Sequence, residues 1–337
     1  MPPFIDYGLT PDTAEELAEL RLHQTTFETY FSGDWEQTHG PYPQRKYKVP
    51  PDIVWASFEP ELRRRKEHFD HLRNQGWCLW WWEIARAYGL PMDQVLWSNQ
   101  GGDTSCAGLS AAMNWSRKTI YQKLTAPVRW DFLNPMAMWA ITKGYSTRGG
   151  QSMAAVKLGA ARYGNYAASD PGIGLYPGRI SRELYEKAAP LAQDRQLCSC
   201  TIPNTVEAVR LCLDALEVVS IGNRRAWRTC RLDRNNILIA VPGDSWAHAW
   251  NYDAIRYVRS VPYFHASNSW GNIYKGSKER DPEIGCWHTA ETVALMLQDA
   301  SCWCSVYAEA FPELSIGSTV FAPKFVGYPD YVLHQHS

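Results

Sequence analysis

The order of helical and extended patterns along the chain constrains its fold more than any other feature. The middle of the 337-residue sequence is rich in small residues and helical in character, whereas β-branched runs such as NILIAV (236–241) come later. Helices followed by strands predict an α+β architecture with two segregated lobes, a helical lobe and then a β-rich lobe.

The first 90 residues carry several helix signals. Thr10, Pro11 and Asp12 form a helix start, which predicts a helix over about 11–30. Further helices are expected over about 59–73 and in the tryptophan-rich stretch 76–88, which Gly89 ends. We therefore expect a mainly helical N-terminal extension, 1–90, that packs on the remainder or contacts an assembly partner. The main domain then covers 91–337, with a C-terminal extension from about residue 285.

Composition limits the kinds of partner. The chain has 34 Lys and Arg against 35 Asp and Glu, so its net charge of -1 favours neither nucleic acid nor an anionic membrane surface. No apolar run approaches the ~18 residues of a membrane-spanning helix, and the N-terminus lacks the pattern of a secretory signal. Nine cysteines without an export signal are expected to be reduced thiols, which predicts a cytoplasmic or virion-associated protein.

One cysteine, Cys106, has neighbours suited to nucleophilic chemistry. Asp103, Thr104 and Ser105 are all competent helix N-caps, and the small residues of AGLSAA after the thiol allow a helix to enter a packed interior. A thiol at a helix N-terminus has a lowered pKa. Gln100 lies six residues upstream, before Gly101 and Gly102, which let the chain turn back. Its amide is a candidate oxyanion donor beside the Cys106 N–H.

A general base and its orienting residue are expected much later in the chain. His248 lies in DSWAHAW, 142 residues after Cys106. Asn268 follows in SNSWGN, where it can fix the imidazole tautomer, and Trp270 can shield that hydrogen bond from water. His265 is a rival base, but it is expected to share a strand with Asn268, a poor geometry for a Cys–His–Asn line.

These segments resemble the papain-like cysteine peptidases. NQGGDTSC resembles their active-site segment, HAW and NSWG resemble their His and Asn boxes, and RGGQS (148–152) resembles their Gly-Gly turn, all in the family's order over roughly 91–275. The resemblance implies a thiol hydrolase, most simply an endopeptidase, that acts on a polypeptide without a cofactor. It also implies that Gly149 and Gly150 offer backbone to an extended substrate.

The sequence departs from the family at several positions. Ala107 stands where the family has Trp, and Ala247 where many members have Asp or Asn. Asp103 and Thr147 occupy the positions of the family's disulfide cysteines, which agrees with a reducing environment. The family's inhibitory propeptide motifs are not evident in 1–90.

Three other functions remain open. The same fold could serve as a structural component of a larger assembly such as a virion, with reduced or no activity, since a fold can persist after its catalytic activity is lost. A related Cys/His hydrolase could act on peptidoglycan or other amide links. Zinc binding is less favoured because the candidate ligands lack the usual C-x-x-C spacing, and because CWCSVYAEAF (302–311) is interpreted as a helix interior. The candidate ligands form three pairs, Cys198/Cys200, Cys286/His288 and Cys302/Cys304. Our expectation is therefore that the protein contains no metal.

Overall fold

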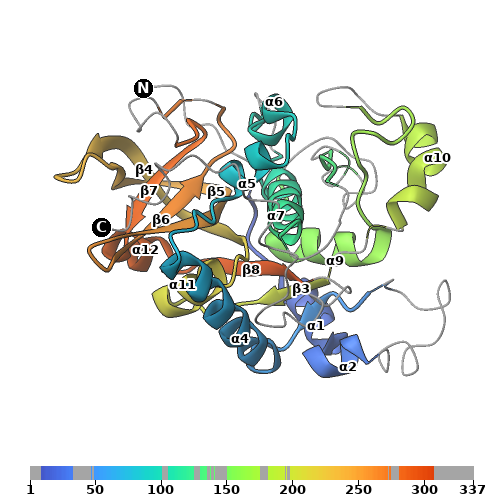
Figure 1. Ribbon diagram of the computed structural model, residues 1–337. Coiled ribbons are helices and arrows are strands. Elements are labelled where there is room, and N and C mark those ends of the chain that lie inside the picture. The colour runs from blue at the N-terminus through green and yellow to red at the C-terminus, as the bar shows by residue number, and fades with distance from the viewer. Residues whose placement is uncertain are drawn as a thin grey trace.

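The computed structural model is described over residues 9–32, 47, 49–100, 105–124, 130–134, 137, 140, 150–174, 181–193, 195, 198–271, 273–274 and 281–306. Helices dominate the first two thirds of this part of the chain and strands dominate the last third. Figure 1 shows the helices α6, α7, α9 and α10 on one side of the molecule and the strands β4 to β7 on the other. The predicted α+β class, helices before strands, is confirmed.

A single mixed sheet organises the described strands. Its order is β1-β2-β3-β8-β4-β5-β6-β7, and β5 also pairs with β7. The strands are β1 (Gln24–Thr25), β2 (Asp52–Ile53), β3 (Cys198–Thr201), β4 (Val219–Leu232), β5 (Leu238–Val258), β6 (Val261–Ser267), β7 (Gly285–Thr289) and β8 (Ser301–Val306).

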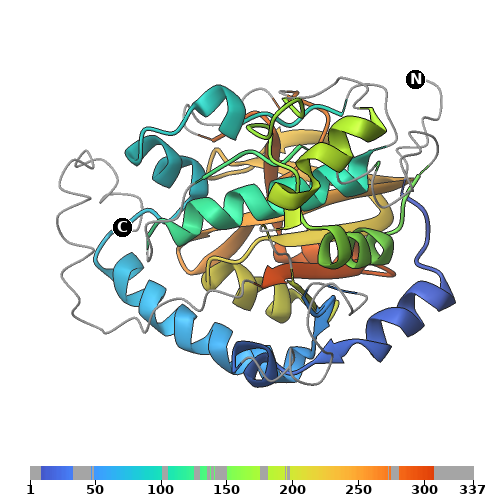
Figure 2. The same cartoon turned by 90° about the vertical axis from the view of Figure 1, so that its right-hand side faces the viewer.

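The helices flank this sheet along its length. They are α1 (Ala14–Leu22), α2 (Phe27–Phe31), α4 (Trp55–Asn74), α5 (Trp81–Ala87), α6 (Met92–Val95), α7 (Cys106–Gln122), α9 (Met153–Tyr163), α10 (Arg182–Gln193), α11 (Val206–Asp214) and α12 (Ala290–Met296). All 17 residues of α7 are buried. A helix buried all round must find partners for its polar side chains inside the protein. Figure 2 shows α7 lying lengthwise against the sheet.

The N-terminal segment differs from its prediction. The helix expected over 11–30 is divided into α1 and α2, because Gln24 and Thr25 pair in parallel with Asp52 and Ile53 as β1 and β2. The helix begins at Ala14, where Thr13 and Glu16 form a capping box. Helical propensity gave no sign of this strand pairing, which depends on residues 28 positions away.

Three later segments also differ from their predictions, two in the bounds of a helix and one in its secondary structure. The helix expected over 59–73 runs from Trp55 to Asn74, and the tryptophan-rich helix begins only at Trp81, although Gly89 follows it with a φ of 65° as expected. The prediction of a helix interior around Cys302 and Cys304 is wrong, because this segment forms the strand β8. The residues 302–306 of β8 are all buried, Ser305 included, so the strand lacks the alternation of apolar and polar residues that would have indicated its period.

The described part of 1–90 packs closely on the rest of the chain. The Asp12 carboxylate accepts from the Ala154 N–H at 2.8 Å, at the first turn of α9. The Lys157 ammonium donates to Asp52 at 2.6 Å, with both side chains buried. Trp81 and Trp82 are fully buried in an apolar cluster. This segment is thus joined to the sheet and to α9 by buried contacts.

Candidate active site

Cys106 is the first residue of α7 and is fully buried. Ser105, one of the three N-cap candidates in the sequence, occupies the N-cap position, but its hydroxyl makes no capping bond. The first-turn N–H groups of a helix lack intrahelical partners and carry the positive end of the helix dipole. The thiol sulfur therefore lies where a thiolate is electrostatically favoured.

His248 lies on β5 and is held by Asn268, which directly follows β6. The distance between His248 Nε2 and Asn268 Oδ1 is 2.6 Å. The Ser269 backbone N–H also donates to Oδ1, at 2.7 Å, and because an N–H can only donate, this bond fixes the oxygen toward the imidazole. Nε2 therefore carries the proton in the neutral imidazole, and Nδ1 is the nitrogen able to accept one.

Strand register places Trp270 beside the same imidazole. Asn251 of β5 is paired with Ser267 of β6, and in an antiparallel pair a step of three back on β5 matches a step of three forward after β6. His248 is consequently opposite Trp270, and their rings stack with centroids 4.9 Å apart at 21°. The indole is therefore next to the ring that Asn268 binds, and its shielding of that bond stays a prediction.

Burial decides the protonation of His248. The side chain is 1% exposed, and desolvation lowers its pKa to about 4, while the bond to Asn268 opposes this shift. The imidazole is therefore neutral at neutral pH in this structure. A thiolate nearby would favour the protonated ring and raise the pKa.

Gln100 is brought to Asn268 by a short antiparallel contact. Its backbone N–H donates to the Ser269 carbonyl at 2.8 Å, and Asn99 bridges to Trp270. The Ser269 hydroxyl donates to Gln100 Oε1. That bond turns the amide oxygen toward Ser269 and directs the amide NH₂ to the other side, where it can serve as a donor. Gly271, with a φ of 77°, lets the chain turn beside this contact.

The direction of α7 relative to β5 follows from side-chain contacts. Ser110 Oγ donates to the Trp250 carbonyl at 3.1 Å. Two turns later Arg117 Nη1 donates to Asp253 Oδ2 at 2.5 Å. Both sets of contacts advance together along the helix and the strand, so α7 and β5 run in the same direction.

This parallel arrangement brings Cys106 and His248 to the same end. One turn back from Ser110 is about 6 Å along the helix, and two residues back from Trp250 is about 6.6 Å along the strand. Those steps end at Cys106 and His248. Cys106 also belongs to the same buried apolar cluster as Ala249, the neighbour of His248. The nucleophile and base that the sequence suggests thus lie on adjoining elements.

The edge that the family resemblance predicts to bind substrate is only partly described. Gly150 is half-buried at the start of this edge, whereas Gly149, Gly101, Gly102, Asp103 and Thr147 lie outside the described residues. Leu9 forms a parallel bridge with Gln151, and the Thr10 N–H donates to the Gln151 carbonyl at 3.1 Å. The N-terminal segment therefore lies directly beside Gly150.

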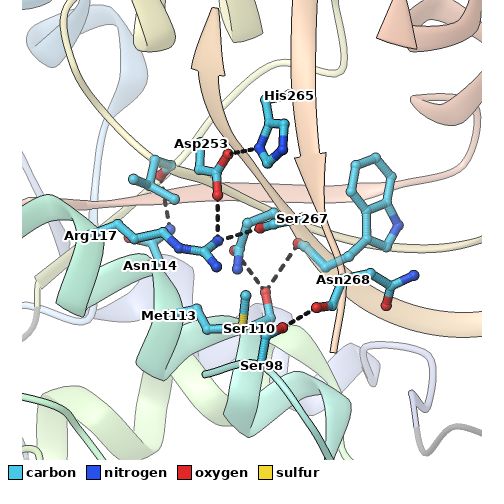
Figure 3. Close-up of polar contacts among 12 residues, drawn as sticks. Ser98, Ser110, Met113, Asn114, Arg117, Asp253, His265, Ser267 and Asn268 are labelled. Atoms are coloured by element: carbon cyan, nitrogen blue, oxygen red, sulfur yellow. Dashed lines mark hydrogen bonds and ion pairs between the residues drawn. The ribbon is translucent and has the colours of Figure 1, made fainter. Parts of the chain in front are cut away.

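Four site residues had no functional interpretation at the level of sequence. Ser269 orients Gln100, Tyr274 Oη accepts from Asn268 Nδ2 at 3.0 Å, and Ser98 Oγ donates to the Asn268 carbonyl. Arg117 contacts Asp253 and Ser267 (Figure 3). Ser269 could have been found because it lies inside SNSWGN. Ser98, Arg117 and Tyr274 lie outside the recognisable motifs, although Ser98 is two residues before Gln100 and Tyr274 six residues after Asn268.

The rival interpretations find different surroundings. His265 lies on β6 and its Nδ1 is 2.7 Å from Asp253 Oδ1, in a fully buried pocket beside Trp82 and Trp287. All nine cysteines are free thiols. Within the described residues, no group of three or more His, Cys, Asp or Glu side chains is arranged to hold a metal ion.

None of the described helices has the length and apolar character needed to cross a membrane.

Comparison with known proteins finds similarity at the level of structure. No protein-family model and no curated protein matches the sequence. The chain is similar in structure to xylellain, a cysteine protease from Xylella fastidiosa, with 14% identity, a TM-score of 0.48 and coverage of 89% of this chain and 96% of xylellain. The ragweed pollen cysteine protease Amb a 11, in its proform, has 12% identity, a TM-score of 0.45 and coverage of 90% and 100%. Bromelain from Ananas comosus, in complex with the inhibitor E64, has 12% identity, a TM-score of 0.43 and coverage of 62% and 92%.

Proposed function

We propose that this protein is a papain-like thiol hydrolase, and specifically an endopeptidase, with Cys106, His248 and Asn268 as its catalytic triad. The observation that supports this most is the bond from His248 Nε2 to Asn268 Oδ1 under the Trp270 ring. It leaves Nδ1 as the basic nitrogen on an element adjoining Cys106. A nucleophile, a base and an orienting group in this order are what acyl transfer needs.

The proposed reaction begins with proton transfer from the Cys106 thiol to His248 Nδ1. The thiolate attacks the substrate carbonyl carbon, and the oxygen that becomes negative accepts from the Cys106 N–H and the Gln100 amide. The protonated His248 then donates its proton to the leaving amine as the C–N bond breaks. Water attacks the thioester with His248 as base, which releases the acid and restores the thiol.

The proposed substrate is an extended polypeptide. Gly150 lies beside Gln151, whose carbonyl already accepts a backbone N–H from Thr10. A backbone that binds one extended segment in this way can bind another by strand addition. A peptide substrate at Gly149 and Gly150 would displace the N-terminal segment from this edge.

Labelling with an epoxide thiol-peptidase inactivator tests the proposal. We expect stoichiometric modification of Cys106 in the full chain, located by peptide mapping, and loss of this modification in Cys106→Ala and His248→Ala. The partly exposed Cys230 serves as an internal control for ordinary thiol reactivity. Equal, slow modification of Cys106 and Cys230 would contradict an activated thiolate.

A structural role in a larger assembly is the second candidate. It is favoured by the burial of Cys106, His248, Asn268 and Gln100, each at most 2% exposed, and by the contact of Leu9 with Gln151. In this case residues near the N-terminus cover the site permanently. Absence of labelling both in the full chain and in a variant that lacks residues 1–10 would support this role over the enzyme.

A further inference from the structure

We propose that Arg117 is a positioning residue, which holds the helix of the nucleophile in register with the strands that carry His248 and Asn268. The inference rests on the proposed thiol hydrolase function. Arg117 lies on α7, eleven residues and about three turns after Cys106. It is therefore too far from the thiol to touch a substrate, and it acts through other residues.

One guanidinium nitrogen joins three segments of the site. Arg117 Nη1 donates to Asp253 Oδ2 at 2.5 Å and also donates to Ser267 Oγ. Asp253 follows His248 by five residues on β5, and Ser267 directly precedes Asn268. Figure 3 shows the Arg117 side chain extending from α7 to these two residues, with His265 on the far side of Asp253.

The surroundings of this cluster leave its members little freedom. Arg117 is 2% exposed and Asp253 is fully buried. The guanidinium carbon lies 4.6 Å from the centroid of the Trp81 ring, which fixes the plane of the fork. The other oxygen of Asp253 is bound to His265 at 2.7 Å. Each group is thus oriented by a second contact.

A buried ion pair adds little to the free energy of unfolding, but it can fix the position of a helix relative to the strands beside it. Desolvation offsets much of the attraction between the charges, so apolar side chains of similar volume would hold α7 against the sheet equally well. Apolar contacts, however, allow a helix to slide or rotate by small amounts. An Nη1 that donates to two fixed acceptors, on a guanidinium that lies over the Trp81 ring, permits far fewer arrangements.

The link from Arg117 to the chemistry passes through Asn268. Its carbonyl accepts from Ser98 Oγ, and its N–H donates to the Ile284 carbonyl at 2.9 Å. Arg117 supplies the contact on the preceding residue, Ser267. Loss of that contact would allow Asn268 to shift, and with it the Nδ1 atom of His248, which Asn268 orients.

Ser267→Ala tests this link without leaving a buried charge unpaired. We expect the maximal rate of Cys106 alkylation by the epoxide to fall about 10-fold with an unchanged half-saturation concentration, since a shift of about 1 Å in reacting groups can cost on the order of 100-fold. Arg117→Lys, which keeps the charge opposite Asp253 but has a shorter side chain and loses the planar group that lies over Trp81, should give a fall of similar size.

Ser305→Ala is the matched control. Ser305 is also fully buried and also bonds α7, through Asn114 Oδ1 at 2.7 Å, but it does not contact Asn268. We expect both serine variants to lower the melting temperature to a similar extent and only Ser267→Ala to slow alkylation. Equal alkylation rates in the two variants and in the unaltered protein would overturn the inference. If neither the unaltered protein nor the variant that lacks residues 1–10 is labelled, the proposed function fails and this inference fails with it.

Discussion

Two buried histidines on neighbouring strands, His248 and His265, have hydrogen-bond partners of different charge. His248 bonds the neutral amide of Asn268 and stacks on Trp270, whereas His265 bonds the carboxylate of Asp253 and packs against Trp82. Both are at most 1% exposed. The difference therefore lies in the charge of the partner and not in the depth of burial.

The nature of the partner determines what each imidazole can do. An amide orients His248 without fixing its charge, so the ring can gain and lose a proton when charge develops nearby. The Asp253 carboxylate is shared between His265 and Arg117, and these neighbours hold its pKa below the ordinary value despite burial. The first arrangement suits a base, and the second suits a fixed structural contact.

The largest expected effect comes from giving His265 an amide partner. Asp253→Asn leaves Arg117 without its buried counter-charge, which we expect to lower the free energy of unfolding by about 3–5 kcal/mol. Chemical denaturation at neutral pH measures this. Asn251→Ala, at a fully buried side chain on the same strand, controls for a change in local packing. A loss below about 1 kcal/mol would show that the two histidine environments are more alike than their partners suggest.

Acid should destabilise the fold through His248. Its folded-state pKa of about 4 is below the ordinary 6.5, so the unfolded chain binds more protons between these values. The stabilisation is complete above about pH 6.5 and falls as the pH drops toward 4, by about 3 kcal/mol in total. His288, whose pKa burial lowers to about 3, adds a loss of the same sign.

Denaturation curves between pH 7 and pH 4 measure this dependence. We expect His248→Gln, which cannot be protonated, to give a shallower loss of stability than the unaltered protein. If the free energy of unfolding depends on pH in the same way in both proteins, other groups cause the acid sensitivity, and the protonation of His248 does not distinguish it from His265.

A smaller effect should follow from giving His248 a carboxylate partner. Asn268→Asp places a negative charge beside the imidazole, which we expect to raise the pKa of His248 by about 1–3 units. Titration of the ring proton signals by NMR measures the shift, with Asn268→Gln as the neutral control. An unchanged pKa would mean that Asn268 does not govern the ionisation of His248 as the geometry indicates.

The local structure around the predicted site residues agrees with the sequence better than the structure of two other segments does, while the catalytic roles of these residues stay predictions. Cys106 at a helix start, His248 on a strand and Asn268 after the next strand each follow from a short local pattern. The extent of α1 and the strand β8 did not, because both depend on pairing with residues far along the chain. Their local composition fits either state.

The sequence by itself determined which residues are candidates for this chemistry, because it fixes where a thiol, an imidazole and an amide occur along the chain, whereas their reactivity depends on their surroundings. It also determined the order of helices and strands. The tertiary structure decided which of two histidines receives a neutral partner, how Arg117 connects α7 to the ends of β5 and β6, and that the N-terminal segment lies beside Gly150. These outcomes depend on strand register and on buried contacts between residues more than 100 positions apart, which no local pattern encodes.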